Sequence, residues 1–401
     1  MDMFHDNPML AGIRQMLGAF AKQSIRPLAA KHDLEESMPW ELMKSAQAFG
    51  MTQTAVLDGR RKLTGIEEDP DPKKPKSQAR LAVAASEEMA WGCAGISLAL
   101  AGSGLACSPV QSMGSDEQKQ EFRKLLAGVD DKGHVRVAAM ALSEPGTGSD
   151  ISGLSTSAVA DGDHWVIRGS KQWITNGQSA SAYVVWAQTE ASAGRAGVRG
   201  FIIARDTPGL VPGKKETKLG IRASETAQVH FEDVRVHKDM MLGAGRTGGL
   251  ADTKKMLDST RPAVGSQSVG IARAAFEFLL ERVQSTSLHG TPMASHQHIM
   301  FELADMQMEI TAARMLAHRA AWMADHHLEN VAEASMAKAH GARTAQYVTT
   351  RAMVLLGEEA LEPGHPVEKW YRDAKIYDIF EGTGQIQRRI LAKQMTGQNP
   401  T

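Results

Sequence analysis

The chain has 401 residues, 42% of them hydrophobic and 23% charged, which is enough for a large core and for two or three structural units. Its 45 Lys and Arg residues almost balance 46 Asp and Glu residues, so the net charge is −1. A chain this close to neutral carries no global field that would attract nucleic acid or an anionic membrane. The two cysteines, Cys93 and Cys107, exclude a disulfide framework, and we expect both as small core residues in a reducing compartment.

The start of the chain, MDMFHDNPML, has no basic segment followed by an apolar one, so we expect no signal peptide. No apolar run has the length needed to cross a bilayer. These features predict a cytoplasmic protein that does not contact a membrane.

Helical patterns dominate the first third of the chain. Residues 7–25 place Leu10, Ile13, Leu17 and Phe20 at helical spacing, and residues 39–51, 79–102 and 115–128 also have helical character. Ser115 is a candidate N-cap. The charged, proline-containing residues 58–78 between these helices predict an exposed loop. We therefore expect an N-terminal all-α domain over residues 1–132.

From about Val135 the pattern changes to short apolar and β-branched runs, at residues 135–142, 163–177, 182–189, 200–206 and 227–236. The dipeptides Asp161-Gly162 and Asn176-Gly177 are turn signals between them. Residues 133–245 are accordingly predicted to form a compact antiparallel β domain.

Ala-, Leu- and Met-rich stretches with a 3.6-residue period follow, chiefly at residues 272–284 and 299–326. We expect residues 246–401 to form a helical bundle, which makes the fold class α+β and multi-domain. The histidine pairs in SHQHIM and DHHLEN could suggest metal, but no matching cysteine or carboxylate set accompanies them, so no metal site is predicted.

Four segments are candidates for a functional role beyond supporting the fold: ALSEPGTGSD at 141–150, GSKQWITNG at 169–177, LGIRASETAQVHFEDVRV at 219–236 and WYRDAKIYDIFEGTGQIQRRI at 370–390. Each has a simpler interpretation when taken alone, as a glycine-rich turn, a hairpin or a capped helix with an exposed Glu. Together, in this order and in the α–β–α arrangement, they resemble the acyl-CoA dehydrogenase family of flavoproteins over nearly the whole chain. The resemblance implies that the C-terminal domain is a four-helix bundle and that the cofactor is FAD.

The resemblance also implies roles for the two β-domain motifs. Met140, Leu142 and Ser143 are expected against the flavin ring, while Gly148 and Ser149 face the phosphates and the acyl-CoA. In the second motif, Trp173 and Ile174 are expected to flank the flavin and Thr175 to bond near its N5 atom. Small residues suit this task, because they let backbone N–H groups approach an anion or a ring edge.

The fourth motif provides the predicted base. A group that removes a proton next to a thioester must lie on a positioned loop and be shielded from water. By resemblance this group is Glu381, with its backbone N–H polarising the thioester carbonyl and Gly382 leaving room for the acyl chain. Contacts to flavin phosphates or ribose are implied for Thr383, Gly384 and Gln385, at the start of the following helix. Asp258 and Arg261 match the position that meets the CoA adenine, although an Asp-x-x-Arg pair is commonly a surface ion pair.

Two features that serve the flavin of a neighbouring subunit in the family are absent. In register, Thr286 and His289 replace an Arg and a Phe, and Val354 and Glu358 replace a Gln and a Gly. The intact Glu381 and the altered positions together suggest an α2β2 hetero-oligomer with a paralogue, and a homodimer that tolerates the changes through other contacts is the alternative.

The expected reaction is dehydrogenation of an acyl-CoA to the trans-2-enoyl-CoA, with an electron-transferring flavoprotein as the acceptor. Acyl-CoA oxidases and nitroalkane oxidases, which share the fold but pass electrons to oxygen, are the first alternative. A non-catalytic stabilising partner and a nucleic-acid-binding relative are the others; Glu381 argues against the former and the near-zero charge against the latter.

Overall fold

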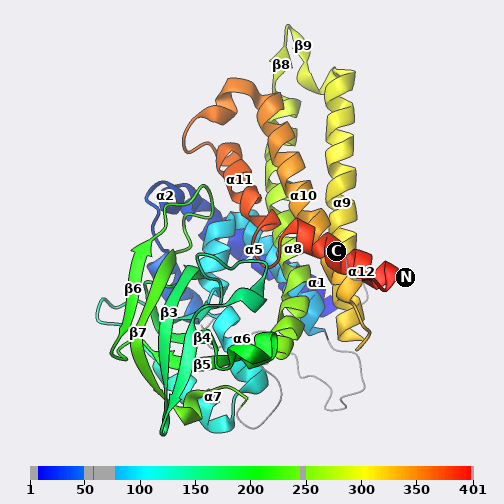
Figure 1. The fold of residues 1–401 in the computed structure, drawn as a ribbon. Coiled ribbons are helices and arrows are strands. Elements are labelled where there is room, and N and C mark those ends of the chain that lie inside the picture. The colour runs from blue at the N-terminus through cyan, green and yellow to red at the C-terminus, as the bar shows by residue number, and fades with distance from the viewer. Residues whose placement is uncertain (1–7, 49–56, 58–76, 244–249, 399–401) are drawn as a thin grey trace.

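The structure is a computed structural model that describes residues 8–48, 57, 77–243 and 250–398, with the side chains of 8, 9, 48 and 250–259 excepted. Helices precede a sheet, and helices follow it (Figure 1). The predicted exposed loop at residues 58–78 lies almost wholly outside the described residues.

The N-terminal part is helical, as the sequence predicts. Its α-helices are α1 (Pro8–Phe20), α2 (Ala29–Leu34), α3 (Trp40–Ala48), α5 (Gln78–Ala101), α6 (Gly104–Met113) and α7 (Asp116–Leu125). Ser115 caps α7 through a reciprocal pair of bonds with Gln118, which confirms the predicted N-cap. Cys93 and Cys107 are both buried, as expected of core residues.

Helix α5 is not continuous, although its sequence reads as one helix. Cys93 leaves the helical region (φ −168°, ψ 121°), with Gly92 and Gly95 on either side. The break redirects the second half of the helix, so that Ser97 and Leu98 line the central cavity described below.

The middle of the chain forms a seven-stranded sheet in the order β1-β4-β2-β3-β7-β6, with β5 paired to β4. Its strands are β1 (Val137–Ala141), β2 (Ser157–Asp161), β3 (His164–Thr175), β4 (Ala180–Gln188), β5 (Val198–Ala204), β6 (Leu210–Lys215) and β7 (Thr226–His237). Most pairs are antiparallel, as predicted, but β1 runs parallel to β4, and β2 meets β4 in parallel at one position. The turn signals could not indicate this, because they report only on strands joined by a short hairpin.

Three long helices carry the C-terminal part: α8 (Leu250–Ser285), α9 (Gln297–Asp325) and α10 (Val331–Leu356). A short hairpin of β8 (Ser287–Leu288) and β9 (Thr291–Pro292) joins α8 to α9 at one end of the bundle (Figure 1). Helices α11 (Pro366–Ala374) and α12 (Gly384–Thr396) follow, separated by a 3₁₀ turn, Lys375–Asp378, and a short loop. The regular helix before Glu381 therefore ends at Ala374. The bundle core is continuous from Ala94 of α5 to Tyr377.

No single helix among the described residues is long and apolar enough to cross a membrane; the bent pair α5 and α6 passes by length and composition only, and both helices are largely buried. Within the same residues, no group of three or more His, Cys, Asp or Glu side chains is arranged to hold a metal ion.

Candidate active site

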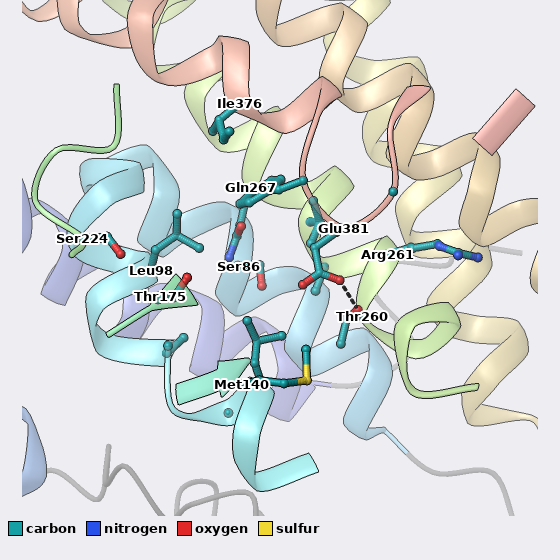
Figure 2. A pocket seen from close by; sticks show the side chains of 18 of the residues that line it. Ser86, Leu98, Met140, Thr175, Ser224, Thr260, Arg261, Gln267, Ile376 and Glu381 are labelled. Carbon is teal, nitrogen blue, oxygen red and sulfur yellow. Dashed lines mark hydrogen bonds between the residues drawn. The ribbon is translucent and has the colours of Figure 1, made fainter. Parts of the chain in front are cut away.

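A cavity of about 2830 Å3 lies where the helical parts meet the sheet. Its wall is formed by α1, α5, the loop after β1, the end of β3, the cavity-facing side of α8 and the start of α12. In Figure 2, side chains from α5, β1, β3 and α8 converge around the Glu381 carboxylate. The cavity thus brings together segments more than two hundred residues apart in the chain.

Glu381 lies on the loop between the 3₁₀ turn and α12, and its carboxylate lines the cavity. The Thr260 hydroxyl of α8 donates a hydrogen bond to its Oε2 at 3.1 Å (Figure 2). Burial raises the pKa of Glu381, and the Thr260 hydrogen bond and the charges of Arg261 and Lys338 oppose that rise. Because burial prevails, the site holds a carboxylate that binds a proton more tightly than an ordinary Glu does.

A second part of the wall is the loop after β1, which a buried ion pair fixes in place. Lys171 of β3 donates to the carboxylate of Glu144 at 2.8 Å and to the carbonyl of Leu142 at 3.0 Å. The Glu144 carboxylate also accepts from the backbone N–H groups of Ser155 and Thr156. Burial alone would raise the pKa of Glu144, but these donors lower it to about 2, so the carboxylate is charged at neutral pH.

Trp173 owes its position to an irregularity in β3. Lys171 pairs with Val229 and Ile174 with Ala227, so β3 has one residue more than β7 in this interval. Trp173 lies within this bulge with φ 63°, in the left-handed region. Its indole is 60% exposed and lines the cavity. The bulge therefore presents a flat aromatic surface that a regular strand would not.

Beyond Glu381, a polar group closes part of the cavity. Gln267 of α8 is only 8% exposed, and its buried amide oxygen has no hydrogen-bond partner in the described structure. In Figure 2 the Gln267 side chain extends from α8 toward Ser86 and Leu98 of α5. Thr260, Val264 and Gln267 follow helical spacing, which places them on one face of α8 toward the cavity.

Most of the predicted site residues line this one cavity: Met140, Leu142, Ser143, Gly148, Ser149, Trp173, Ile174, Thr175, Arg261, Glu381, Gly382 and Thr383. Arg261 is buried, and its side chain extends away from Glu381 in Figure 2. Gly384 and Gln385 lie outside the cavity wall, since Gly384 packs against Asp378 and Gln385 faces outward. The side chain of Asp258 is outside the described residues. The roles assigned to Gly384, Gln385 and Asp258 remain predictions.

Sequence reasoning missed several residues that shape the site. Thr260 lies between Asp258 and Arg261, the two residues that the resemblance selects, but the resemblance gives Thr260 no role. Lys171 and Glu144 lie inside two of the four segments, but nothing local indicates that they pair, because they are 27 residues apart in the chain. An isolated Gln in a helical apolar stripe, as at Gln267, is the only hint the sequence offered.

The charged side chains of the cavity wall are mostly basic: Arg195, Arg199, Lys218, Lys375, Arg389 and Lys393. Two acidic residues of the wall are neutralised, Glu144 by Lys171 and Asp325 by Arg80. The remaining positive charge suits a ligand that carries phosphates.

Comparison with known proteins identifies relatives of the whole chain. Models of the acyl-CoA dehydrogenase N-terminal, middle and C-terminal domains match residues 75–129, 139–234 and 247–396. The mitochondrial short-chain specific acyl-CoA dehydrogenase of Bos taurus is 38% identical over 95% of this chain and 88% of its own. The butyryl-CoA dehydrogenase structure from Megasphaera elsdenii is 31% identical, with a TM-score of 0.86, over 98% of this chain and all of that one. A prolyl acyl carrier protein oxidase is also similar, at 27% identity and a TM-score of 0.85, over 97% of this chain and 99% of that one.

Proposed function

The chain belongs to the acyl-CoA dehydrogenase family, FAD-dependent oxidoreductases that act on CH–CH groups, and on that premise we propose that Glu381 is the base that starts the reaction. The observation that supports this proposal most directly is the position of the Glu381 carboxylate. It lies on a loop that lines a cavity of about 2830 Å3, which we propose holds both FAD and the acyl-CoA. The substrate is an acyl-CoA thioester, and the product is the trans-2-enoyl-CoA.

The environment of Glu381 fits removal of a proton from carbon. A carbon acid is weak, so the base must have a high proton affinity in the bound state, and burial provides it by raising the pKa. Thr260 orients the carboxylate through its hydrogen bond. Glu381 thus receives the α-proton, and the β-hydride leaves on the opposite side; when bound, FAD supplies the acceptor for that hydride.

The residues present fit a flavin. The exposed indole of Trp173 offers a flat face, and Met140 and Thr175 line the cavity beside it. The fixed loop at Leu142 and Ser143 completes this surface. We assign these residues, with Ile174, to holding the ring, while Gly148, Ser149 and Thr383 lie on the same wall for the phosphate-bearing parts of the ligands.

The shape of the wall favours a short acyl chain. Gln267 lies seven residues beyond Thr260 on α8, roughly 10 Å along the helix, and we propose that it is the wall against which the acyl chain ends. The short-chain relative from Bos taurus supports the same choice.

An anaerobic titration tests the proposal. The purified protein, alone and co-expressed with a paralogue, is mixed with butyryl-, octanoyl- and palmitoyl-CoA, and flavin absorbance and enoyl-CoA are measured. We expect fast bleaching with butyryl-CoA and little with palmitoyl-CoA. A flavin-loaded protein that no acyl-CoA bleaches would overturn the proposal.

The same sample distinguishes a dehydrogenase from an oxidase, the alternative that the similarity to the acyl carrier protein oxidase keeps open. Air is admitted after bleaching. A dehydrogenase keeps its flavin reduced until an electron-transferring flavoprotein is added, which is the acceptor we propose. Rapid recovery of colour with formation of hydrogen peroxide would identify an oxidase.

A further inference from the structure

The loop that carries Glu381 has an unfavourable backbone conformation. Glu381 has φ 55° and Gly382 φ 89°, so two successive residues occupy the left-handed region. A residue with a side chain adopts this region at an energetic cost, and it persists only where surrounding groups impose it. The position of the carboxylate therefore depends on whatever holds the loop.

Two buried side chains hold it from behind the cavity wall. The Lys338 ammonium of α10 donates to the carbonyl of Gly382 at 2.6 Å. The Gln387 amide of α12 donates to the carbonyls of Glu381 and Gly382 at 3.2 and 3.1 Å. Lys338 is fully buried and Gln387 is 1% exposed, and neither lines the cavity. Both carbonyls thus point into the bundle while the Glu381 carboxylate points out of it.

Close packing of two helices places Lys338 there. A Cβ on Gly265 of α8 would lie 2.6 Å from the carbonyl of Ala337 on α10. A Cβ on Gly341, one turn further along α10, would likewise lie 2.6 Å from the carbonyl of Gly265. These glycines let α10 approach α8 closely beside Lys338. A Cβ on Gly382 would in turn lie 2.5 Å from the Gln387 amide nitrogen, so the loop has room for this arrangement only with glycine at that position.

Building on the proposed function, we propose that Lys338 is a positioning residue for the base: with Gln387 it fixes the loop, and its charge favours the ionised carboxylate. The titratable groups that act on Lys338 are Asp378, Glu381 and Arg261. Those that act on Glu381 are Arg261 and Lys338, beside the Thr260 hydrogen bond. Loss of Lys338 removes one of the two cations near the base and one of the donors to its loop.

The test compares Lys338→Met with Lys369→Met in the full-length, flavin-loaded protein. Lys369 is the control, since it is also a buried lysine, but its ammonium pairs with the Asp373 carboxylate and not with the loop that carries Glu381. For each variant we measure flavin content, the dissociation constant of butyryl-CoA and the rate of anaerobic flavin reduction across pH. Misplacement of a reacting group by about 1 Å can slow a reaction about 100-fold.

We expect Lys338→Met to retain its flavin and its affinity for butyryl-CoA. Its flavin should be reduced at least about tenfold more slowly at neutral pH, and the acid limb of its pH–rate profile should lie at higher pH than that of the parent. Lys369→Met lowers the melting temperature but leaves the acid limb unchanged. Gln387→Leu supplies a second readout: it slows reduction without moving the acid limb, because it removes no charge.

Two results would overturn the inference while leaving the proposed function intact. In one, Lys338→Met is reduced at the parent's rate with the parent's pH profile. In the other, Lys338→Met and Lys369→Met lose rate equally and neither acid limb moves. Failure of every acyl-CoA to bleach the parent protein is a different result, and it concerns the proposed function.

Discussion

Glu381 shows how a single carboxylate is tuned by opposing effects. Burial raises its pKa, while the Thr260 hydrogen bond and two nearby cations favour the charged form. The balance keeps the group titrating above the ordinary Glu value of 4.5. A base of this kind must be deprotonated to act, so activity falls as the pH drops through its pKa. We therefore expect the acid limb of kcat/KM to lie above pH 4.5.

Thr260→Val tests the hydrogen bond at this scale. The replacement keeps the size of the side chain and removes the donor, so the ionised form of Glu381 loses one stabilising interaction. We expect the acid limb of kcat/KM to move to higher pH, with flavin content unchanged. Thr260→Ser, which keeps the hydroxyl, is the control. An acid limb in Thr260→Val identical to that of the parent would show that the hydrogen bond does not tune the base.

At this scale the sequence predicts some residues better than others. The family resemblance locates Glu381, because the segment that carries it, residues 370–390, is contiguous in the sequence. The partners of Glu381 are not visible in this way: Thr260 is 121 residues away in the chain. Lys338 and Gln267 are polar helical residues, which are usually exposed, and only the packing of α8 against α5 and α10 buries them.

The elements that position the site are irregular ones. The bulge in β3 turns Trp173 into the cavity, and the break at Cys93 directs the second half of α5 past it. The ion pair of Lys171 and Glu144 joins the β3 strand to the loop after β1. Apolar runs and helical periods predicted most of the strands and helices, although β2 and β6 lie outside the predicted runs. These patterns could not predict the bulge, the break or the parallel pairing of β1, because each of these depends on contacts with another element.

Lys171→Met tests the ion pair. It leaves Glu144 buried without its cation, and breaking a buried pair in this way costs about 3–5 kcal/mol. We expect a clear fall in melting temperature together with weaker flavin retention. The double variant Lys171→Met/Glu144→Gln removes both charges and should recover much of the loss. Equal melting temperatures for Lys171→Met and the parent would contradict this account.

The Lys171–Glu144 pair also predicts the pH range over which it stabilises the fold. The pKa of Glu144 in the folded protein is about 2, below its ordinary 4.5, so its contribution to stability is present above about pH 4.5 and is lost as the pH falls toward 2. Burial lowers the pKa of Lys171 to about 8, so the pair is fully charged only below that pH. Melting temperatures of the parent and of Glu144→Gln should therefore converge as the pH falls from about 4.5. A difference that persists unchanged at pH 2 would be inconsistent with a charged Glu144.

The whole molecule brings three structural parts around one cavity, and none of them forms the cavity alone. The fold class and the family resemblance were predictable from sequence, because the motifs span nearly the whole chain. The oligomeric assembly was less predictable from sequence than the fold, and the α2β2 assembly remains a proposal. Val354 is 57% exposed at the end of α10, and Glu358 and His289 are also exposed. In Figure 1, the β8–β9 hairpin and the end of α10 occupy the same end of the bundle.

This surface is where the resemblance places groups that serve a neighbouring subunit's flavin, and the substitutions there support an α2β2 assembly with a paralogue. We expect the lone chain to purify with substoichiometric FAD. The triple variant Thr286→Arg/Val354→Gln/Glu358→Gly should raise occupancy, since an Arg–phosphate bond contributes on the order of 1.5–3 kcal/mol. Thr286→Lys/Val354→Gln/Glu358→Gly is the control for charge alone. Full FAD occupancy and turnover from the lone parent chain would contradict the hetero-oligomer.

The most direct test of the account is the rate at which butyryl-CoA bleaches the flavin of Glu381→Gln, measured anaerobically beside the parent. Gln has the same shape but cannot accept the α-proton, so flavin content and ligand binding should be unchanged while bleaching slows by about 10²–10⁴-fold. Bleaching of Glu381→Gln at the parent's rate would contradict the assignment of the base.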